Sequence, residues 1–330
     1  MSSSVRRDWR RVTVSAPGRI NIIGDHTDYT GGLVLPMVVD LHTVVHGEPN
    51  TSDTITLASA DEEFPVSIPV DLPEPGRVDP PWGRYVAGVV AELRDLGYDI
   101  PGFAGGVSTT LPIGAGLSSS AALEVALARA ILESTGQEPP NDLDLARALQ
   151  RAEHRASGVP CGIMDQLAII AGRPGRATLI DCQDLTVDLI DLPPDIEFVV
   201  RHVMSRTLAG SEYADRVDQC RRIEQVIGPL RAADIGDLER LGDPVLRRRA
   251  RHVITENERV RDFVAAIGAH DPVEAGRLMT EGHRSLAEDY GTSNEFMDQA
   301  VRSMLAEPGV LGARMTGGGF GGCLVALRRI

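Results

Sequence analysis

A glycine- and serine-rich segment, LPIGAGLSSSAALE at residues 111–124, has the composition of an anion-binding loop. Gly114 and Gly116 let the backbone turn tightly and approach a ligand closely. The hydroxyls of Ser118, Ser119 and Ser120 follow, and a helix-forming segment begins at once. Backbone N–H groups and the helix dipole can therefore bind phosphate at this point. An ordinary Ser-rich helix N-terminus is the alternative that these glycines and serines, taken alone, leave open.

A second segment, residues 15–40, places polar side chains in a turn-prone stretch between two apolar strands. It reads SAPGRINIIGDHTDYTGGLVLPMVVD and contains Arg19, Asp25, His26 and Asp28. These side chains can converge on a hydroxyl-rich ligand while the strands anchor them. An isolated Asp-His or Thr-Asp pair would more often be a solvated turn, but the combination favours a binding site.

Two carboxylates occur near predicted helix ends in a third segment, RAEHRASGVPCGIMDQLAII at residues 151–170. Glu153 lies near the end of one helix and Asp165 at the start of the next, with a Gly- and Pro-containing loop between them. This arrangement suits one metal ligand and one catalytic group. Each carboxylate could equally be an ordinary helix-end charge.

A fourth segment, ARMTGGGFGGCLVAL, contains a run of glycines at residues 317–322. By itself this run resembles a weak nucleotide-loop match. A tight β-turn explains it as well. A short pair of strands is expected on either side of it.

The composition excludes several classes of chemistry. All 33 basic residues are Arg and the sequence contains no Lys, so there is no Walker A lysine, no protein-kinase strand lysine and no Schiff base. The formal charge of −14 argues against a nucleic acid or an anionic membrane as partner, because both require a basic face. Any phosphate transfer must therefore work without an ammonium group.

The cysteine pattern and the apolar runs indicate a soluble, cytoplasmic protein. Neither a membrane span nor a signal peptide is expected, because no apolar run reaches about 18 residues and the N-terminal segment is polar and basic. The cysteines are far apart and form no CxxC pair, so reduced thiols are expected rather than disulfides or a zinc site. They are Cys161, Cys182, Cys220 and Cys323.

Strand and helix patterns alternate without a strict βαβ rhythm, which predicts an α+β fold. Long periodic segments predict helices over 82–96, 118–133 and 143–156, and several more between 211 and 307. Strands are expected at 11–15, 54–59, 64–69, 177–180, 186–190 and 197–203. Pro193 and Pro194 interrupt the pattern, and we place a boundary there between an N-terminal domain, 1–193, and a C-terminal domain, 194–330.

In this order, the segments resemble the GHMP kinase superfamily, and within it the galactokinase family. GRINIIGDHTDYTGG resembles the galactokinase signature, LPIGAGLSSSAALE the phosphate loop and RMTGGGFGGC the third motif of the superfamily. The likeness continues through PCGIMDQ, LIDCQDL, LAGSEYADRVDQC and HRSLAEDY, from about residue 15 to residue 327. It implies two α+β domains with the active site between them, an N-terminal one that is ribosomal-protein-like and a C-terminal one that is ferredoxin-like.

The resemblance also implies roles for individual residues. Asp165 would face the C1 hydroxyl of the sugar with Arg19 as its cationic neighbour, and Ser120 and Glu153 would bind Mg²⁺. The predicted sugar-binding residues are Asp25, His26, Asp28, Gly162 and Tyr213. The predicted ATP-binding residues are Gly114, Ala115, Gly116, Leu117, Ser118, Ser119, Ser120 and Ala121 in the phosphate loop, with Trp82 and Tyr85 at the adenine. An ordinary core-facing helix explains Trp82 and Tyr85 nearly as well.

The sequence departs from the family pattern at two places near the predicted sugar site. The family usually has Glu where this chain has Asp25, and the stretch RHVMSR at residues 201–206 replaces a run that is normally rich in Asn and Ser. The expected activity is the ATP-dependent phosphorylation of the anomeric hydroxyl of galactose by a monomer. The same chemistry on a uronic acid, an amino sugar or a pentose is the first alternative, and a non-catalytic sugar sensor is the second.

Overall fold

Two compact units make up the computed structural model, which describes residues 9–72, 74–204 and 212–330. Strands β1 (Val12–Ile23) and β2 (Leu33–Asn50) each contribute residues to both units. Among the described residues, unit 1 comprises those within 9–18, 40–112 and 119–161. Unit 2 comprises those within 19–39, 113–118 and 162–330.

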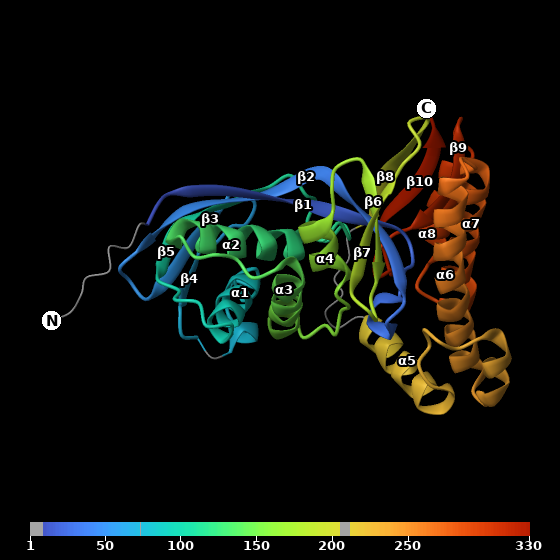
Figure 1. Cartoon of the computed structure of the whole chain (residues 1–330), viewed down its shortest axis with the longest axis horizontal. Helices are drawn as coiled ribbons and strands as arrows, with labels where there is room; N and C mark the ends of the chain where they lie inside the picture. Colours follow the sequence, from blue (N-terminus) through green and yellow to red (C-terminus); the bar gives the residue numbers. More distant parts are fainter. Residues whose placement is uncertain (1–8, 73, 205–211) are drawn as a thin grey trace. The chain divides into compact units, whose positions relative to one another are not determined.

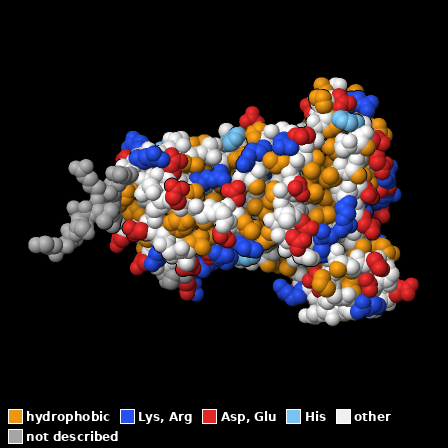
Figure 2. Space-filling model, viewed as in Figure 1, with side chains coloured by type: hydrophobic (Ala, Val, Ile, Leu, Met, Phe, Trp, Pro, Cys, Tyr) orange, Lys and Arg blue, Asp and Glu red, His pale blue; other side chains and the backbone are white. Residues whose placement is uncertain are grey.

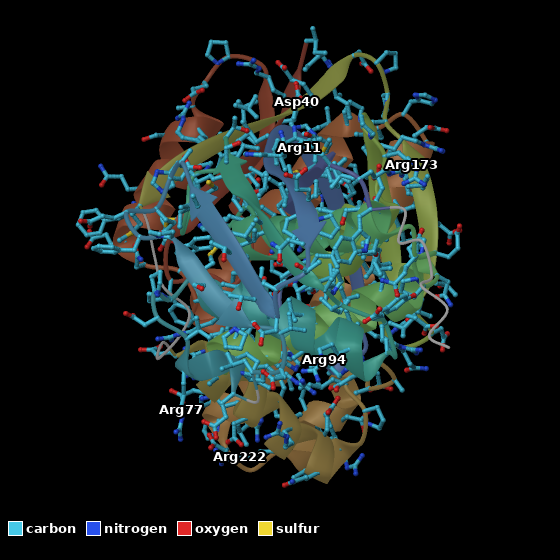
Figure 3. The ribbon with its side chains drawn as sticks, turned by 90° about the vertical axis from the view of Figure 1, so that its left-hand side faces the viewer. Arg11, Asp40, Arg77, Arg94, Arg173 and Arg222 are labelled. Carbon is cyan, nitrogen blue, oxygen red and sulfur yellow. The ribbon has the colours of Figure 1, made fainter. Side chains whose placement is uncertain are left out.

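Unit 1 is a sheet with three helices on one side (Figure 1). Its strands are ordered β4 (Val66–Pro69), β3 (Thr54–Ser59), β5 (Gly102–Thr109) and β2, with β3 and β5 parallel and the other pairs antiparallel. The helices are α1 (Gly83–Asp95), α2 (Ser119–Thr135) and α3 (Asp142–Ser157), with a short 3₁₀ turn at Pro75–Arg77. Figure 3 shows Arg94 on the helix side of this unit and Arg11 on the strand side.

Local sequence explains the helix ends and the strand spacing in unit 1. Helix α3 begins where the Asn141 side chain accepts a hydrogen bond from the Asp144 N–H, which satisfies one of the free donors of the first turn. Strand β5 is not apparent from the sequence pattern, because glycine has a poor strand propensity. A Cβ at Gly105 would collide with the His46 carbonyl oxygen of β2, so close approach of the two strands requires glycine there.

Unit 2 contains two groups of strands. In the first, β2 pairs antiparallel with β6 (Arg176–Asp181), which pairs with β7 (Thr186–Asp191). In the second, β10 (Gly322–Arg329) lies between β8 (Ile196–Met204) and β9 (Val310–Met315), and all neighbours are antiparallel. The helices of this unit are α4 (Met164–Ala171), α5 (Tyr213–Ile227), α6 (Pro244–Gly268), α7 (Pro272–Ser285) and α8 (Glu295–Leu305). Short 3₁₀ turns occupy Asp28–Thr30 and Ile235–Arg240, and a π-helical turn, η4, occupies Leu286–Tyr290.

Capping and apolar packing hold the helices of unit 2 in place. Asp243 caps α6 and Asp271 caps α7, and each of these helices has Pro in its first turn, where no N–H is needed. Asn294 caps α8 in the same way, with its side chain accepting from Met297 N–H. A buried apolar cluster of helix and strand side chains, including Ile223, Met304 and Leu324, forms the core against the β8–β10–β9 sheet.

These elements confirm the expected α+β class and most of the expected strands and helices, including β3 at residues 54–59. The domain boundary at Pro193 and Pro194, which lie between β7 and β8, stays a prediction. Residues 205–211 lie outside the described part of the chain. They include the end of the RHVMSR stretch at residues 201–206, which departs from the family pattern, and the beginning of LAGSEYADRVDQC at residues 208–220.

Surface properties agree with the composition. Arg side chains are interspersed with Asp and Glu over the face shown in Figure 2. Within residues 9–72, 74–204 and 212–330, no helix has the length and apolarity needed to cross a membrane. The four cysteines are free thiols.

Candidate active site

Asp165, Arg19 and Ser118 form a hydrogen-bonded group in unit 2. Asp165 lies in the first turn of α4, and Arg19 comes from β1. The Asp165 Oδ1 accepts from Arg19 Nε at 2.8 Å and from Arg19 Nη2 at 2.5 Å, while Oδ2 accepts from the Ser118 hydroxyl at 2.5 Å. The Asp165 side chain remains 31% exposed, so a ligand can still reach it. The carboxylate is therefore held by charge-assisted hydrogen bonds without being sealed off.

The same arginine attaches the glycine- and serine-rich loop to this group. Arg19 Nη1 donates to the Gly116 carbonyl at 2.7 Å, and the Arg19 N–H donates to the Leu117 carbonyl at 3.1 Å. Gly114 and Gly116 have φ of 74° and 81°, values that glycine adopts readily. Ser118 has φ of 57° although it is not glycine, and its bond to Asp165 helps to hold this unusual backbone.

Asp28 and Gly162 lie beside this group. A Cβ at position 162 would overlap the Asp28 carboxylate, so the glycine makes room for that side chain. Burial raises the pKa of Asp28 to about 7, the negative charge of Asp165 acts in the same direction, and Arg19 opposes both. Two nearby carboxylates therefore differ in environment, as in sites where one carboxyl binds and the other takes part in proton transfer.

His26 is surrounded by tyrosines. Its Nδ1 lies 2.9 Å from the Tyr29 hydroxyl, and its ring centroid lies 5.6 Å from that of Tyr213 and 4.6 Å from that of Tyr290. His26 has φ of 65°, which is uncommon for a residue with a side chain. Tyr213 begins α5, directly after Glu212. The predicted sugar-site residues His26 and Tyr213 are thus brought together.

Sequence reasoning gave no separate role to Tyr290, which completes this aromatic group. The π-helical turn η4 ends at Tyr290, and its hydroxyl lies 2.6 Å from the Tyr29 hydroxyl and 3.2 Å from Cys220 Sγ. The HRSLAEDY motif contains Tyr290, but the apolar periodicity of a sequence does not distinguish a π-helical turn from an α-helix. Such turns are frequent at functional sites.

Asp25 has a different environment from the other predicted sugar-binding residues. It is 1% exposed, and its carboxylate accepts hydrogen bonds from Asn21, Gly317 and Arg314. Arg314 also pairs with Glu256 of α6 at 2.7 Å. Arg314 is the first residue of the RMTGGGFGGC motif, but the motif does not indicate its partner, and Glu256 lies in none of the quoted motifs.

The glycine run at residues 317–322 forms the connection between β9 and β10. Its Gly317 N–H donates to Asp25 Oδ1 at 2.9 Å, and the Phe320 N–H donates to the Thr292 carbonyl at 2.7 Å. Several of these glycines have positive φ, which a tight connection between antiparallel strands requires. The structure therefore agrees with the tight-turn interpretation of this run.

Most of the remaining predicted residues belong to unit 1, whereas Ala115 belongs to unit 2. Ser119 and Ser120 begin α2, and Ala121 is buried in it, so the loop does lead into a helix N-terminus as expected. Glu153 lies on α3, and its negative charge helps burial to raise the pKa of Tyr85 on α1. Assignment of these residues and of Ala115 to ATP, and of Ser120 and Glu153 to a metal, stays a prediction.

Trp82 has a packing role that needs no ligand. It is buried, and its indole N–H donates to the Phe64 carbonyl at 3.0 Å. In residues 9–72, 74–204 and 212–330, no group of three or more His, Cys, Asp or Glu side chains could hold a metal ion. The predicted pair of Ser120 and Glu153 provides a hydroxyl and a carboxylate, hard oxygen donors of the type that Mg²⁺ binds together with substrate phosphates.

Three family models match the sequence. The model of the galactokinase galactose-binding signature matches residues 6–49, that of the GHMP kinases N terminal domain matches residues 84–173, and that of the GHMP kinases C terminal domain matches residues 263–328. They therefore cover the Arg19 to Asp28 segment, the glycine- and serine-rich loop with Asp165, and the segment that ends in β10.

Proteins that are similar to this chain over most of its length are named galactokinase. The galactokinase of Homo sapiens is 41% identical over 331 residues, covering 96% of this chain and 83% of that protein. The galactokinase of Mycobacterium tuberculosis is 42% identical over 325 residues, covering 96% and 88%. The crystal structure of Lactococcus lactis galactokinase complexed with galactose matches with a TM-score of 0.90 and 32% identity, covering 97% of this chain and 86% of that one. This chain belongs to the galactokinase family of the GHMP kinase superfamily, and it has the two-domain α+β fold of that superfamily.

Proposed function

We propose that this protein transfers the γ-phosphoryl group of ATP to the anomeric hydroxyl of galactose, giving galactose 1-phosphate and ADP. The observation that carries the proposal is the Asp165 carboxylate, held by Arg19 and Ser118 beside Asp28. Family membership supports the use of ATP. The galactose-binding signature and the galactose complex of the Lactococcus lactis relative support the sugar.

Asp165 would receive the proton of the sugar hydroxyl as the oxygen attacks the γ-phosphorus. A new P–O bond forms, the bond between the γ-phosphorus and the bridging oxygen breaks, and ADP leaves with that oxygen. General-base help of this type contributes about 10² to 10⁴ in rate. Arg19 orients the carboxylate through two N–H donors and adds positive charge where the transferred group gathers negative charge.

Asp28, Gly162, His26 and Tyr213 would form the sugar site. Asp28 is a hydrogen-bonding group for sugar hydroxyls, and with its raised pKa it can both donate and accept near neutral pH. The His26 and Tyr213 rings offer apolar surface against the sugar, together with polar edges. Asp25 is not included in this site, because its buried carboxylate already accepts hydrogen bonds from Asn21, Gly317 and Arg314.

The nucleotide would bind at the glycine- and serine-rich loop. Residues Gly114 to Ala121 lead into the N-terminus of α2, where backbone N–H groups and the helix dipole favour phosphate. Ser120 and Glu153 would hold Mg²⁺, which when bound neutralises charge on the β- and γ-phosphates. The absence of Lys from the sequence makes these N–H groups, together with Arg19, the chain's means of binding phosphate.

A coupled ADP-release assay across a panel of free sugars tests the proposal. We expect the highest kcat/KM for galactose among galactose, galacturonate, galactosamine and a pentose. Substantial turnover of galacturonate with little turnover of galactose would show that the proposed sugar is wrong but the proposed reaction is right. Binding of galactose without ADP release from any sugar would instead indicate a sensor.

A further inference from the structure

We infer that Asp25 is a positioning residue, which fixes the sugar-binding loop to a buried ion cluster and does not itself contact the sugar. The inference rests on the proposed function, because it concerns how that sugar site is held. It replaces the sugar contact expected for this position from the sequence. Three observations support it: the donors around the carboxylate, the charge balance of the cluster, and the hydrogen bonds that hold the loop backbone.

Protein donors occupy both oxygens of the Asp25 carboxylate. Oδ1 accepts from Asn21 Nδ2 at 3.1 Å and from the Gly317 N–H at 2.9 Å, and Oδ2 accepts from Arg314 Nη2 at 2.7 Å. The residue is 1% exposed. These donors fill three of about four acceptor positions, and because the residue is buried a sugar hydroxyl could reach the carboxylate only by displacing a neighbouring group. A donor left buried without a partner costs about 1 to 3 kcal/mol if it is neutral and more if it is charged.

The charges of the cluster balance without a ligand, although the buried Arg314 Nε and Nη1 atoms have no hydrogen-bond partner among the described residues. Arg314 pairs with Asp25 and with Glu256, and Glu256 pairs with Arg259 at 2.8 Å. Arg314 and Glu256 are both fully buried. Two carboxylates thus meet two guanidinium groups, and the opposite charges lower the pKa of Glu256 although burial opposes them. Removing one member of such a cluster leaves an uncompensated buried charge.

Hydrogen bonds hold the backbone on both sides of His26, and the cluster supplies one of them. Glu256 Oε1 accepts from the Gly24 N–H at 2.9 Å, and His252 Nε2 lies 3.1 Å from the Asp25 carbonyl. That carbonyl can only accept, so His252 Nε2 carries the proton, and burial lowers the pKa of His252 to about 4, which keeps the ring neutral. On the far side, the Thr27 hydroxyl lies 2.8 Å from the Gly24 carbonyl and 2.7 Å from the Leu33 carbonyl.

These contacts explain how His26 keeps its unfavourable backbone. A residue with a side chain at φ of 65° costs energy that the surroundings must overcome. The carboxylate of Asp25 and the carbonyl of Asp25 are both bound immediately before His26. Loss of either anchor should let the loop relax and move the His26 ring away from Tyr213 and Tyr290.

A double-mutant cycle with Asp25→Asn, Arg314→Met and the double variant tests the inference. Thermal unfolding and the KM for galactose are measured for each protein. Each single change should lower Tm by about 6 °C or more, because it leaves the buried cluster with one uncompensated charge. The double variant should regain much of that Tm, since the two side chains depend on one another. The KM should rise in the single variants and recover in part in the double variant.

Glu197→Gln is the matched control. Glu197 of β8 pairs with Arg328 of β10 at 2.6 Å in the same unit, but both side chains are about 40% exposed. An exposed pair contributes little, so Tm should change by less than about 1 °C. The Tm coupling between Asp25 and Arg314 does not require turnover. If no sugar is phosphorylated, the proposed function fails while the positioning role can still be tested.

Asp25→Glu supplies a second test if the cycle variants fold poorly, because it retains the charge. The added methylene displaces the carboxylate by about 1.5 Å and should disturb the bonds to Arg314 and Gly317. Positioning therefore predicts a lower Tm and a higher KM for galactose. A several-fold lower KM with unchanged Tm would overturn the inference, as would an Asp25→Asn variant with wild-type Tm and a large rise in KM that the double variant does not reduce.

Discussion

Unit 2 contains two pairs of Asp and Arg, each with one member from residues 19–25, and the two pairs have different environments. Arg19 and Asp165 form a pair whose carboxylate is 31% exposed, with a second carboxylate, Asp28, beside it. Asp25 and Arg314 form a pair in which both side chains are almost fully buried and Glu256 completes the cluster. Pairing alone therefore does not identify a catalytic carboxylate, and access to a ligand separates the two cases.

The electrostatic balance also differs between the two pairs. At the Asp165 pair two carboxylates share one arginine, so the group can accept a proton or a cationic partner. At Asp25 the carboxylates and guanidinium groups are equal in number. An excess of negative charge in an accessible place is typical of functional sites, whereas a balanced and buried cluster is typical of a structural one.

The strongest prediction concerns Asp165→Asn. The amide retains the shape and can still accept from Arg19, but it cannot accept the sugar proton. We expect kcat to fall by about 10² or more and Tm to change by only a few °C. A coupled assay and thermal unfolding measure the two quantities. A variant that keeps more than about a tenth of wild-type kcat would exclude a proton-transfer role for Asp165, and a large loss of Tm would make this pair structural like the one at Asp25.

The sequence could predict the parts of the fold that depend on local patterns. Strand β3 follows from alternating side chains, and helices α1, α2 and α3 follow from apolar periodicity. Strand β5 could not be predicted, because its glycines reflect contact with β2 rather than an intrinsic preference. Close packing between segments distant in sequence leaves no local signal.

The same limit applies to the site. The order of the motifs predicts that Arg19, Asp28 and Asp165 belong to one site, and the structure brings these side chains together. The motifs could not reveal that Asp25 is buried. Its partner Arg314 is 289 residues away, and Glu256 lies on a helix with ordinary periodicity. Neighbouring residues in one motif can thus have different environments, as Asp25 and Asp28 do.

Gly162→Ala should disturb the Asp165 region alone. The new Cβ would overlap the Asp28 carboxylate and force that side chain to turn. We expect kcat/KM for galactose to fall by about tenfold to a hundredfold, because misplacement by about 1 Å can have effects of this size. Steady-state kinetics with varied galactose measure the change.

Gly242→Ala is the control for this substitution, since nothing lies within 4 Å of the Cβ that it adds. Its kcat/KM should match the wild type within about twofold, a difference well below one kcal/mol. Unchanged kinetics in Gly162→Ala would show that Asp28 does not need its present position for activity.

The smallest expected effect is on the pH dependence of stability, through Asp28. Its pKa is about 7 in the folded protein and near 4 when unfolded, so the folded state keeps a proton that the unfolded state releases. Stability from this group is therefore present below about pH 4 and is lost as pH rises to about 7. The Asp28→Asn variant does not lose stability in this way, because an amide does not ionise. The Tm of the variant minus the Tm of the wild type should therefore increase between pH 4 and 7 and then stay constant.

We expect this difference to reach about 2 °C or more at pH 8. Because the negative charge of Asp165 contributes to the raised pKa, Asp165→Asn should move the wild-type transition to lower pH. Asp25→Asn should move the midpoint of that transition less than Asp165→Asn does, because the largest causes of the raised pKa of Asp28 include Asp165 but not Asp25. These Tm differences and midpoints are measured by thermal unfolding from pH 4 to 9 of the wild type and of the Asp28→Asn, Asp165→Asn and Asp25→Asn variants. A midpoint that moves in Asp25→Asn but not in Asp165→Asn would mean that the two regions are electrostatically coupled, and the distinction between an accessible catalytic pair and a separate structural cluster would then be wrong.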